Sequence, residues 1–467
     1  MTLDSRFGAA LRVPSVRDDE ILIDSTRKEK SGVRLDGRRV TLRDVVVVLP
    51  FVGLPAAIAF DGMRESTSID GAPIGNTSPG NHLFLYLDLG LVLLLVIAGW
   101  ARRRFRAPPG LGPFVLLLAS FMPAMALTSF GPYSSYKVIQ MLTVTAALVF
   151  GALVVIDRPA RRVALLWAAA ALGVLVAVVA VARPNPAYQV RDAVVLTGSV
   201  AITTARIIGL GAVSLLCLGL IVRRWRLVAL VAAAILTVPL IMTGARGPVV
   251  ALAGAGIAVV ACLNRGSRWR SLLPVAALGG LLVYLISSSM LPLSVASRFD
   301  VLRGGPMDDS SEARLELGRI ALDAVLRHPL GVGWGDFGSV VPPGLLMVVP
   351  GREDIIYPHN LALEVASEGG VVALGGLLLL AVSVVHVLRS RGVDPSTFAV
   401  VPVLVFAVIN SMSSSDLNGN LMVWVLAAVI LAARGRWGRH GRESIGRSGL
   451  EHPSRPPIGV RSRLPIP

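Results

Sequence analysis

The chain alternates between long apolar runs and short polar connections from residue 44 to residue 433. A hydrocarbon core about 30 Å thick needs roughly 20 apolar residues in a helix, because a helix satisfies its own backbone in lipid. Suitable runs lie at about 44–60, 82–100, 111–130, 137–156, 163–182, 200–222, 227–243, 247–263, 271–290, 370–388, 397–413 and 421–433. The pattern predicts an all-α integral membrane protein with about twelve transmembrane helices and a large extracytoplasmic loop between the ninth and tenth.

Composition supports the membrane class, since 54% of residues are hydrophobic, 16% are charged, and the mean hydropathy is +0.70. The net charge of +16 is typical of nucleic-acid-binding proteins, but its distribution gives a different explanation. With both termini cytoplasmic, 33 of the 45 lysines and arginines fall on the cytoplasmic side, while the outer loops hold eleven, Lys137 among them. This asymmetry follows the positive-inside rule. It predicts a multi-pass protein of the cell membrane and no nucleic-acid partner.

The two ends of the chain differ from the membrane domain of residues 44–433. Residues 1–43 are polar and charged, and residues 434–467 are rich in Arg, Gly and Pro. Neither segment has enough apolar residues to order itself, so both are expected to be disordered cytoplasmic segments. The basic tail is suited to anionic lipid headgroups. Cys217 and Cys262 lie inside apolar runs, which predicts small core residues and no disulfide.

The expected loop of residues 291–369 contains eleven acidic residues against six arginines, so topology does not explain its arginines. Asp309 to Glu312 has the pattern of a helix N-terminus. Apolar residues then recur with helical spacing at Leu317, Ile320, Ala321 and Ala324. We therefore expect an amphipathic helix that ends before Pro329, lies on the membrane surface and covers a cavity between spans.

Two further segments of this loop carry candidate chemistry. In the segment from His328 to Phe337, three glycines at alternate positions predict a turn where the backbone approaches a ligand. Trp334 and Phe337 either stack on sugar faces or, as we favour, anchor the loop in the membrane interface. Tyr357-Pro358-His359-Asn360 then precedes the tenth span, which puts His359 at its extracytoplasmic mouth.

These motifs resemble the O-antigen ligase/O-antigen polymerase superfamily of bacterial membrane glycosyltransferases. The family signature is a His-Asn pair, nine residues and Gly-x-x-Gly. It reads here as His359-Asn360, nine residues and Gly370-Val371-Val372-Ala373, so alanine replaces the second glycine. The segment from His328 to Gly333 is similar to the family's motif ahead of that histidine.

Four arginines are similar to arginines of this family. Arg246 lies in Thr243-Gly244-Ala245-Arg246-Gly247, which is similar to a Ser-Arg-Gly turn that opens a span, and Arg298 and Arg314 match two loop arginines. Arg206 is the nearest match to a family arginine of the sixth span, although Ile202-Thr203-Thr204 replaces the Asn-Pro pair found there. A charge inside a span is expensive and predicts a cavity or a polar partner.

The resemblance implies transfer of a glycan from undecaprenyl diphosphate to a glycan or lipid acceptor, with no metal and no cofactor. Arginine suits a diphosphate because its fork makes bidentate, charge-assisted bonds to phosphate oxygens. The candidate diphosphate ligands are Arg206, Arg246, Arg298 and Arg314. An imidazole suits removal of the acceptor proton, which makes His359 the candidate general base. Tyr357, Asn360 and Glu364 are expected to orient it or the acceptor.

Structural explanations compete with each of these roles. His359 could cap the following helix, Arg246 could extend to the interface, and Arg314 could pair with Glu312 or Glu316. A transporter or flippase for a lipid-linked or anionic solute is the alternative function, since twelve spans fit it equally well. The single motif-bearing loop and the scarcity of signals for discontinuous helices argue against the transporter.

Overall fold

The computed structural model describes residues 33–35, 38–61, 80–185, 193–196, 199–262, 268–288, 290–306, 309–346, 357–390, 393–414 and 416–433. The expected cytoplasmic tail of residues 434–467 lies outside these ranges, as does most of the expected N-terminal segment. Within that segment, β1 (Val33–Leu35) and β2 (Arg38–Val40) form a short antiparallel hairpin.

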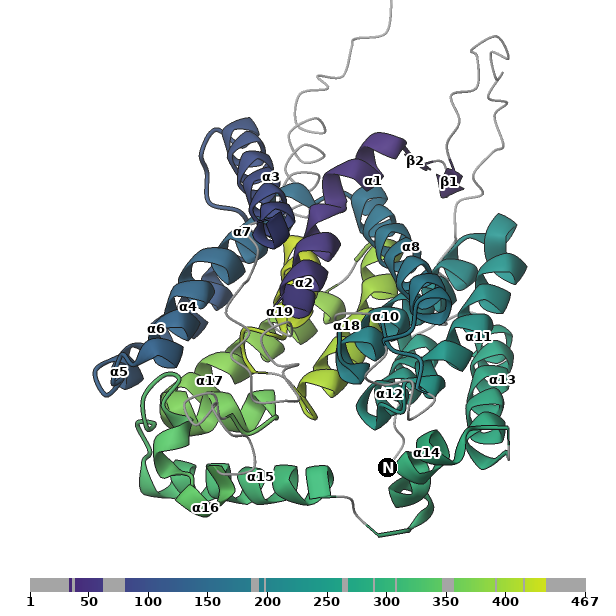
Figure 1. The fold of residues 1–467 in the computed structure, drawn as a ribbon. Helices are drawn as coiled ribbons and strands as arrows, with labels where there is room; N and C mark the ends of the chain where they lie inside the picture. The colour runs from purple at the N-terminus through teal and green to yellow at the C-terminus, as the bar shows by residue number, and fades with distance from the viewer. Residues whose placement is uncertain are drawn as a thin grey trace, which may run out of the picture.

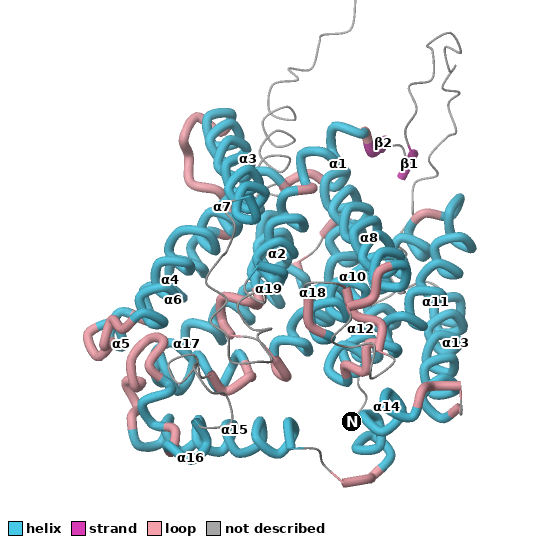
Figure 2. The backbone as a smooth tube through the Cα atoms, in the orientation of Figure 1, coloured by secondary structure: helices cyan, strands magenta, loops and turns pink. Residues whose placement is uncertain are grey.

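The rest of the described chain is almost entirely helical (Figures 1 and 2). The helices before the centre of the chain are α1 (Leu42–Val48), α2 (Pro50–Asp61), α3 (Gly80–Arg102), α4 (Leu111–Ser120), α5 (Met122–Met125), α6 (Pro132–Gln140), α7 (Ala146–Val155), α8 (Pro159–Ala182) and α10 (Ala201–Ile221). Those after it are α11 (Arg226–Met242), α12 (Arg246–Cys262), α13 (Arg268–Ser287), α14 (Leu293–Ala296), α15 (Asp309–Arg327), α16 (Pro343–Leu346), α17 (Leu361–Arg389), α18 (Pro395–Ser411) and α19 (Leu421–Leu431).

Helix length and hydropathy indicate a membrane protein. Within the described residues, four helical segments are long and apolar enough to cross a bilayer, namely Pro132–Val155, Pro159–Ala182, Ala201–Ile221 and Leu361–Arg389. The first of these joins α6 to α7 through a π-helical turn at Met141–Thr145. Shorter apolar helices include Arg226–Met242, Arg246–Cys262, Pro395–Ser411 and Leu421–Leu431. The total of twelve spans and the position of the termini remain predictions.

Helix α10 lies at the centre of the bundle, where it packs against α8, α11, α12 and α18. Small residues allow its closest contact, because a Cβ on Gly173 of α8 would lie 2.6 Å from the Cα of Gly211. Helices in lipid gain from such close van der Waals packing, since apolar burial alone does not favour protein over lipid tails. Arg206, in the second turn of α10, is half-buried and lies at the wall of a pocket inside the bundle.

Helix α17 is broken at Gly370, whose backbone (φ 71°, ψ −173°) is not helical. The turn after α15 fills the break. Val332 N–H donates to the carbonyl of Ser367 (2.9 Å), and Val371 N–H donates to the carbonyl of Pro329 (2.9 Å). Gly331 lies so close that a side chain there would collide with the backbone of α17. The turn therefore supplies hydrogen bonds that the helix loses at its break.

We call these contacts between the turn after α15 and the break in α17 the interlock. They change three expectations from the sequence. The tenth span was expected to begin at residue 370, but the helix already begins at Leu361. Signals for discontinuous helices are scarce in the sequence, yet α17 is discontinuous. The glycines at 331, 333 and 335 were expected to approach a ligand, but each of them faces protein backbone. The Gly369-Gly370 pair is a local signal for this break, but the apolar run that follows it was interpreted as the start of the span.

Helix α15 has the bounds and the buried stripe that its spacing predicts. Ala321 and Ala324 are buried, and Leu317 and Ile320 pack against Phe337, Val341 and the start of α17. In Figure 1, α15 runs across one end of the bundle rather than along it. The expected roles of Trp334 and Phe337 are wrong, since both side chains are buried within the protein. Trp334 stacks on Phe121, with the ring centroids 4.5 Å apart.

Candidate functional site

A polar loop joins α18 to α19 and contacts most of the residues singled out above. We define it as residues 412–414 and 416–420, and it follows directly on Asn410 near the end of α18. Its backbone and side chains hydrogen-bond to α6, α10 and the segment that opens α17. Ser, Asn and Asp are typical of such loops because they hydrogen-bond locally to backbone.

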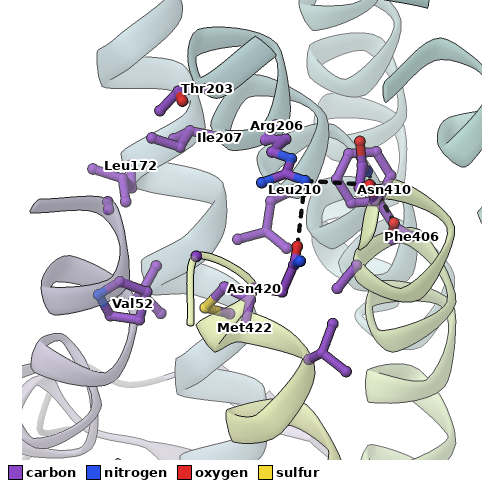
Figure 3. Close-up of a pocket in the computed structure, with 15 residues that line it drawn as sticks. Val52, Leu172, Thr203, Arg206, Ile207, Leu210, Phe406, Asn410, Asn420 and Met422 are labelled. Carbon is purple, nitrogen blue, oxygen red and sulfur yellow. Dashed lines mark hydrogen bonds between the residues drawn. The ribbon is translucent and has the colours of Figure 1, made fainter. Parts of the chain in front are cut away.

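Arg206 reaches this polar loop from α10 (Figure 3). Its Nη2 donates to the carbonyl oxygens of Asn410 (3.2 Å) and Ser414 (2.6 Å), to the Ser414 hydroxyl (2.7 Å) and to Asn420 Oδ1 (3.3 Å). Its Nε is buried and has no hydrogen-bond partner among the described residues. One edge of the guanidinium is thus held by protein, which leaves donor capacity on the other.

A pocket of about 80 Å³ opens beside Arg206. Its lining is mostly apolar and comes from α2, α8, α10, α18 and α19. Figure 3 shows Val52, Leu172, Ile207, Leu210, Phe406 and Met422 around it, together with Arg206. The arrangement combines an apolar cavity with one cationic group at its wall, which is typical of sites for amphiphilic ligands.

Arg246 and Arg298 lie at a turn that packs against the polar loop. Gly244 has a positive φ of 71°, and a Cβ on it would lie 2.8 Å from Cδ of Arg298, so the Arg298 stem lies against this turn. A Cβ on Gly247, one residue after Arg246, would lie 2.5 Å from Oγ of Ser413 in the polar loop. Two of the four candidate diphosphate ligands therefore share one neighbourhood.

Asn360 caps helix α17 and holds its start to the polar loop. Its Oδ1 accepts the N–H groups of Ala362 and Leu363 (3.1 Å each), and its Nδ2 donates to the carbonyl of Met412 (3.3 Å). This capping role belongs to Asn360 and not to His359, which was the structural alternative for the histidine. His359 instead has a left-handed backbone with φ 56°, uncommon for a residue with a side chain.

His359 lies close to Tyr357, with their ring centroids 4.5 Å apart. Burial lowers the pKa of His359 to about 4, and the positive charges of Arg314 and Arg206 lower it further. Burial also raises the pKa of Tyr357 to about 12, assisted by Asp416 and Glu364. The imidazole is thus neutral at ordinary pH, and its Nδ1 has no hydrogen-bond partner among the described residues.

Arg314 lies on α15, and its charge acts on both His359 and Tyr357. Other charges of α15 pair along the helix surface. Glu316 pairs with Arg319 (3.3 Å) and Asp323 with Arg327 (2.9 Å). The amphipathic helix therefore brings one arginine toward the histidine while its outward charges form ordinary exposed pairs.

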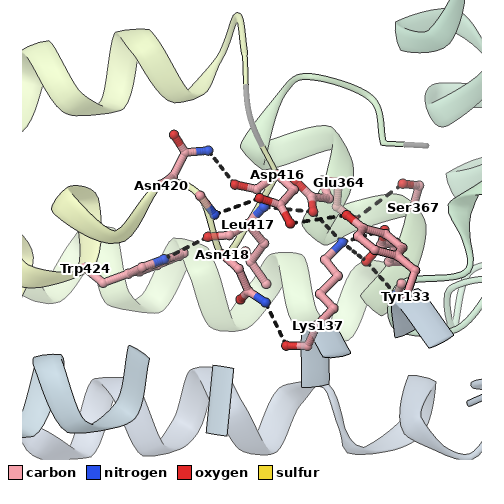
Figure 4. A network of polar contacts seen from close by, with 12 residues as sticks. Tyr133, Lys137, Glu364, Ser367, Asp416, Leu417, Asn418, Asn420 and Trp424 are labelled. Carbon is pink, nitrogen blue, oxygen red and sulfur yellow. Dashed lines mark hydrogen bonds and ion pairs between the residues drawn. The ribbon is translucent and has the colours of Figure 1, made fainter. Parts of the chain in front are cut away.

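Glu364 lies in a buried ion network that the sequence did not predict (Figure 4). Its carboxylate pairs with Lys137, which also binds Glu368 with Nζ–O distances of 2.7 and 2.6 Å. Lys137 was expected in an outer loop and is instead fully buried in α6. Tyr133 of the same helix donates to Asp416 (3.2 Å) in the polar loop.

Some signals for these missed residues are present in the sequence. Glu364 and Glu368 are four residues apart, so they lie on one helix face, and the Ser- and Asn-rich stretch 410–420 interrupts two apolar runs. No pattern links either segment to Lys137, which lies more than two hundred residues earlier.

Within the described ranges, no group of three or more His, Cys, Asp or Glu residues is arranged to hold a metal ion.

Part of the chain matches a known protein family. Residues 231–378 match the family model described as O-Antigen ligase. This segment includes Arg246, Arg298, Arg314 and His359, whereas Arg206, Lys137 and the polar loop lie outside it. No curated protein matches the chain. This match covers about a third of the chain and supports the O-antigen ligase family, which implies a glycosyltransferase-like membrane enzyme of the glycan ligase or polymerase kind.

Proposed function

We propose that this protein is an extracytoplasmic-face, metal-independent glycosyltransferase, acting as a ligase or a polymerase. It moves a glycan from a polyprenyl diphosphate carrier to an acceptor hydroxyl during assembly of cell-surface polysaccharide. The observation that carries the proposal is the gathering of a neutral, half-buried His359 with Arg206 and Arg314, whose charges lower the pKa of His359.

The arginines supply the positive charge that a lipid diphosphate needs as it leaves. Nε of Arg206 has no hydrogen-bond partner among the described residues, and Arg246 and Arg298 share the turn beside Ser413. Charge that develops on the diphosphate is stabilised best by groups already held in place, because no reorganisation is then required. In this proposal Arg206, Arg246, Arg298 and Arg314 bind the diphosphate.

The apolar pocket beside Arg206 suits the lipid part of such a donor. Residues from α2, α8, α10 and α19 line it, and the guanidinium lies at its wall. An isoprenoid chain gains from leaving water for this lining while its diphosphate stays near the arginine. This arrangement favours a lipid-linked anionic substrate over a free sugar nucleotide.

His359 accepts the proton of the acceptor hydroxyl as that oxygen attacks the anomeric carbon. The new bond is the glycosidic C–O bond, the bond that breaks joins the glycan to the diphosphate, and the proton remains on the imidazole until solvent removes it. Direct attack of this kind inverts the anomeric configuration, whereas retention requires a carboxylate nucleophile. Tyr357 and Asn360 position His359, the first by ring contact and the second by capping α17.

A transporter or flippase remains the second candidate because of one observation, the break of α17 at Gly370. Discontinuous helices line substrate sites in many secondary transporters. In this protein the turn containing Pro329 and Val332 fills the break with hydrogen bonds. The break is thus occupied by the chain itself, which favours the enzyme.

Replacement of Arg246 tests the diphosphate role. We expect Arg246→Met to raise the KM for the lipid-linked donor about 10- to 100-fold, because hydrogen bonds to charged groups contribute roughly 1.5–3 kcal/mol. Arg246→Lys keeps the charge but loses the fork and is expected to recover only part of this loss. The measurement is steady-state transfer at varied donor concentration.

Arg327→Met is the matched control, since Arg327 lies in an exposed ion pair on α15. It should leave the donor KM unchanged. An unchanged donor KM in both Arg246 variants would remove Arg246 from the proposed site.

A further inference from the structure

The ion network of Lys137 has a connectivity that the proposed chemistry does not use. The Lys137 ammonium is completely buried and contacts two carboxylates of α17, those of Glu364 and Glu368. The two acids lie one helical turn apart in the half of α17 that precedes its break at Gly370. One side chain of α6 therefore fixes this half-helix at two points (Figure 4).

Each carboxylate also holds a backbone segment other than its own helix. Glu364 Oε1 accepts the N–H of Leu417 in the polar loop (2.9 Å), and Glu368 Oε2 accepts the N–H of Gly335 in the turn after α15 (2.9 Å). The carbonyl of Lys137 accepts Nδ2 of Asn418 (2.7 Å). The network thus joins α6, α17, the polar loop and the turn that fills the break.

The polar loop in turn determines where the proposed reacting groups lie. Ser414 and Asn420 accept the hydrogen bonds of Arg206, and Met412 accepts that of Asn360, the neighbour of His359. The loop touches the arginine on one side and the segment of the histidine on the other. A shift of the loop would therefore disturb the hydrogen bonds that hold Arg206 and the segment of His359 in place.

Stability alone is a weak explanation for this network. Burying ions costs several kcal/mol each, and well-packed apolar residues often serve stability as well or better. Buried polar groups can instead specify one arrangement among several, because a displaced group leaves its partners unpaired. Lys137, Glu364 and Glu368 together fix the relative positions of four chain segments.

We propose that Lys137 is a positioning residue for glycan transfer, which through Glu364, Glu368 and the polar loop holds His359 at a set distance from Arg206. This inference rests on the proposed function for its catalytic consequence, while the anchoring of the loop can be measured without any reaction.

The test is the triple variant Lys137→Met, Glu364→Gln, Glu368→Gln. It removes all three charges, so none is left buried without a partner, and the glutamines can still accept the backbone N–H groups. We expect kcat, counted per donor-binding site, to fall about 100-fold, because small misplacements of reacting groups cost that much. The donor KM should change less than about threefold, since all four arginines of the proposed site are retained.

Two readouts separate positioning from loss of folded protein. Hydrogen exchange at the amides of Leu417 and Gly419 should speed up in the triple variant. The separate variant Lys137→Arg keeps the positive charge and should have a kcat between those of the triple variant and the wild-type protein. Arg327→Met, in an exposed pair on α15, is the control for both readouts.

A triple variant with the wild-type kcat per binding site, or with unchanged exchange in the polar loop, would overturn the inference. Failure of the proposed glycosyltransferase function would give a different result. If wild-type protein transfers no glycan while the triple variant still frees the loop, the proposed function fails and Lys137 stands as the anchor of the loop.

Discussion

Replacing His359 with asparagine is expected to lower the rate of glycan transfer by about 10²- to 10⁴-fold, the usual contribution of a general base. Asparagine fits the space and can hydrogen-bond, but it cannot accept a proton at neutral pH. Donor binding should persist, because the arginines are unchanged. Single-turnover transfer with a lipid-linked donor measures the chemical step, and donor binding in detergent measures the retained affinity.

His386→Asn is the matched control. His386 is an exposed histidine near the other end of the same helix, α17. Its replacement should leave transfer unchanged. Transfer by His359→Asn at the wild-type rate would remove His359 from the mechanism.

The pH dependence of transfer follows from the environment of His359. Burial, Arg314 and Arg206 lower its pKa to about 4 in the free protein, so the base form persists as pH falls from 7 to about 5. A bound diphosphate offsets the positive charges and raises that pKa toward the ordinary value. The acid limb of kcat is therefore expected at higher pH than the acid limb of kcat/KM, since kcat reports the substrate complex. Coincident acid limbs would contradict this coupling.

Replacing Gly370 with alanine is expected to destabilise the protein by about 3 kcal/mol or more, since its backbone conformation is nearly exclusive to glycine and strain there costs about 1–3 kcal/mol before any collision. The collision is severe, because a Cβ would meet Pro329 and Leu330. The turn would have to move away from the break in α17, and the hydrogen bonds from Val332 and Val371 would be lost. Thermal unfolding in detergent measures the effect.

Gly375→Ala is the control for this prediction. Gly375 lies in the continuous half of the same helix, and a Cβ there meets no atom within 4 Å. Alanine at a helical position is expected to be neutral or to stabilise by about 0.5–1 kcal/mol. Equal stability of the Gly370 and Gly375 variants would contradict the interlock.

The sequence predicted those features that depend on local periodicity. The helices at 163–182 and 200–222, the amphipathic helix after Asp309 and the grouping of His359 with Asn360 all follow from residue spacing. Hydropathy identifies such segments well because lipid imposes one requirement on every residue of a span. Helix boundaries were predicted less accurately. Helix α17 begins at Leu361, but its first turns contain Glu364 and Glu368, so hydropathy assigned them to the loop before residue 370.

Features that depend on long-range contacts could not be predicted. Lys137 was interpreted as an outer-loop charge because a lysine near a span end usually reaches water. Its two partners lie more than 220 residues away, and a single sequence contains no signal for that pairing. The break at Gly370 depends on the turn at Pro329. Taken separately, the first segment was predicted to begin a span and the second to approach a ligand. The role of the polar loop in holding both Arg206 and Asn360 depends on such long-range contacts.

The most direct test of the proposed function is glycan transfer by the purified protein in detergent, where there is no sealed compartment. The protein is mixed with a polyprenyl-diphosphate-linked oligosaccharide and an acceptor glycan, and the elongated or ligated product is measured together with released polyprenyl diphosphate. We expect product in detergent from the wild-type protein and none above background from His359→Asn. Activity that requires sealed vesicles, with movement of the lipid-linked glycan and no new glycosidic bond, would contradict the enzyme and support a transporter.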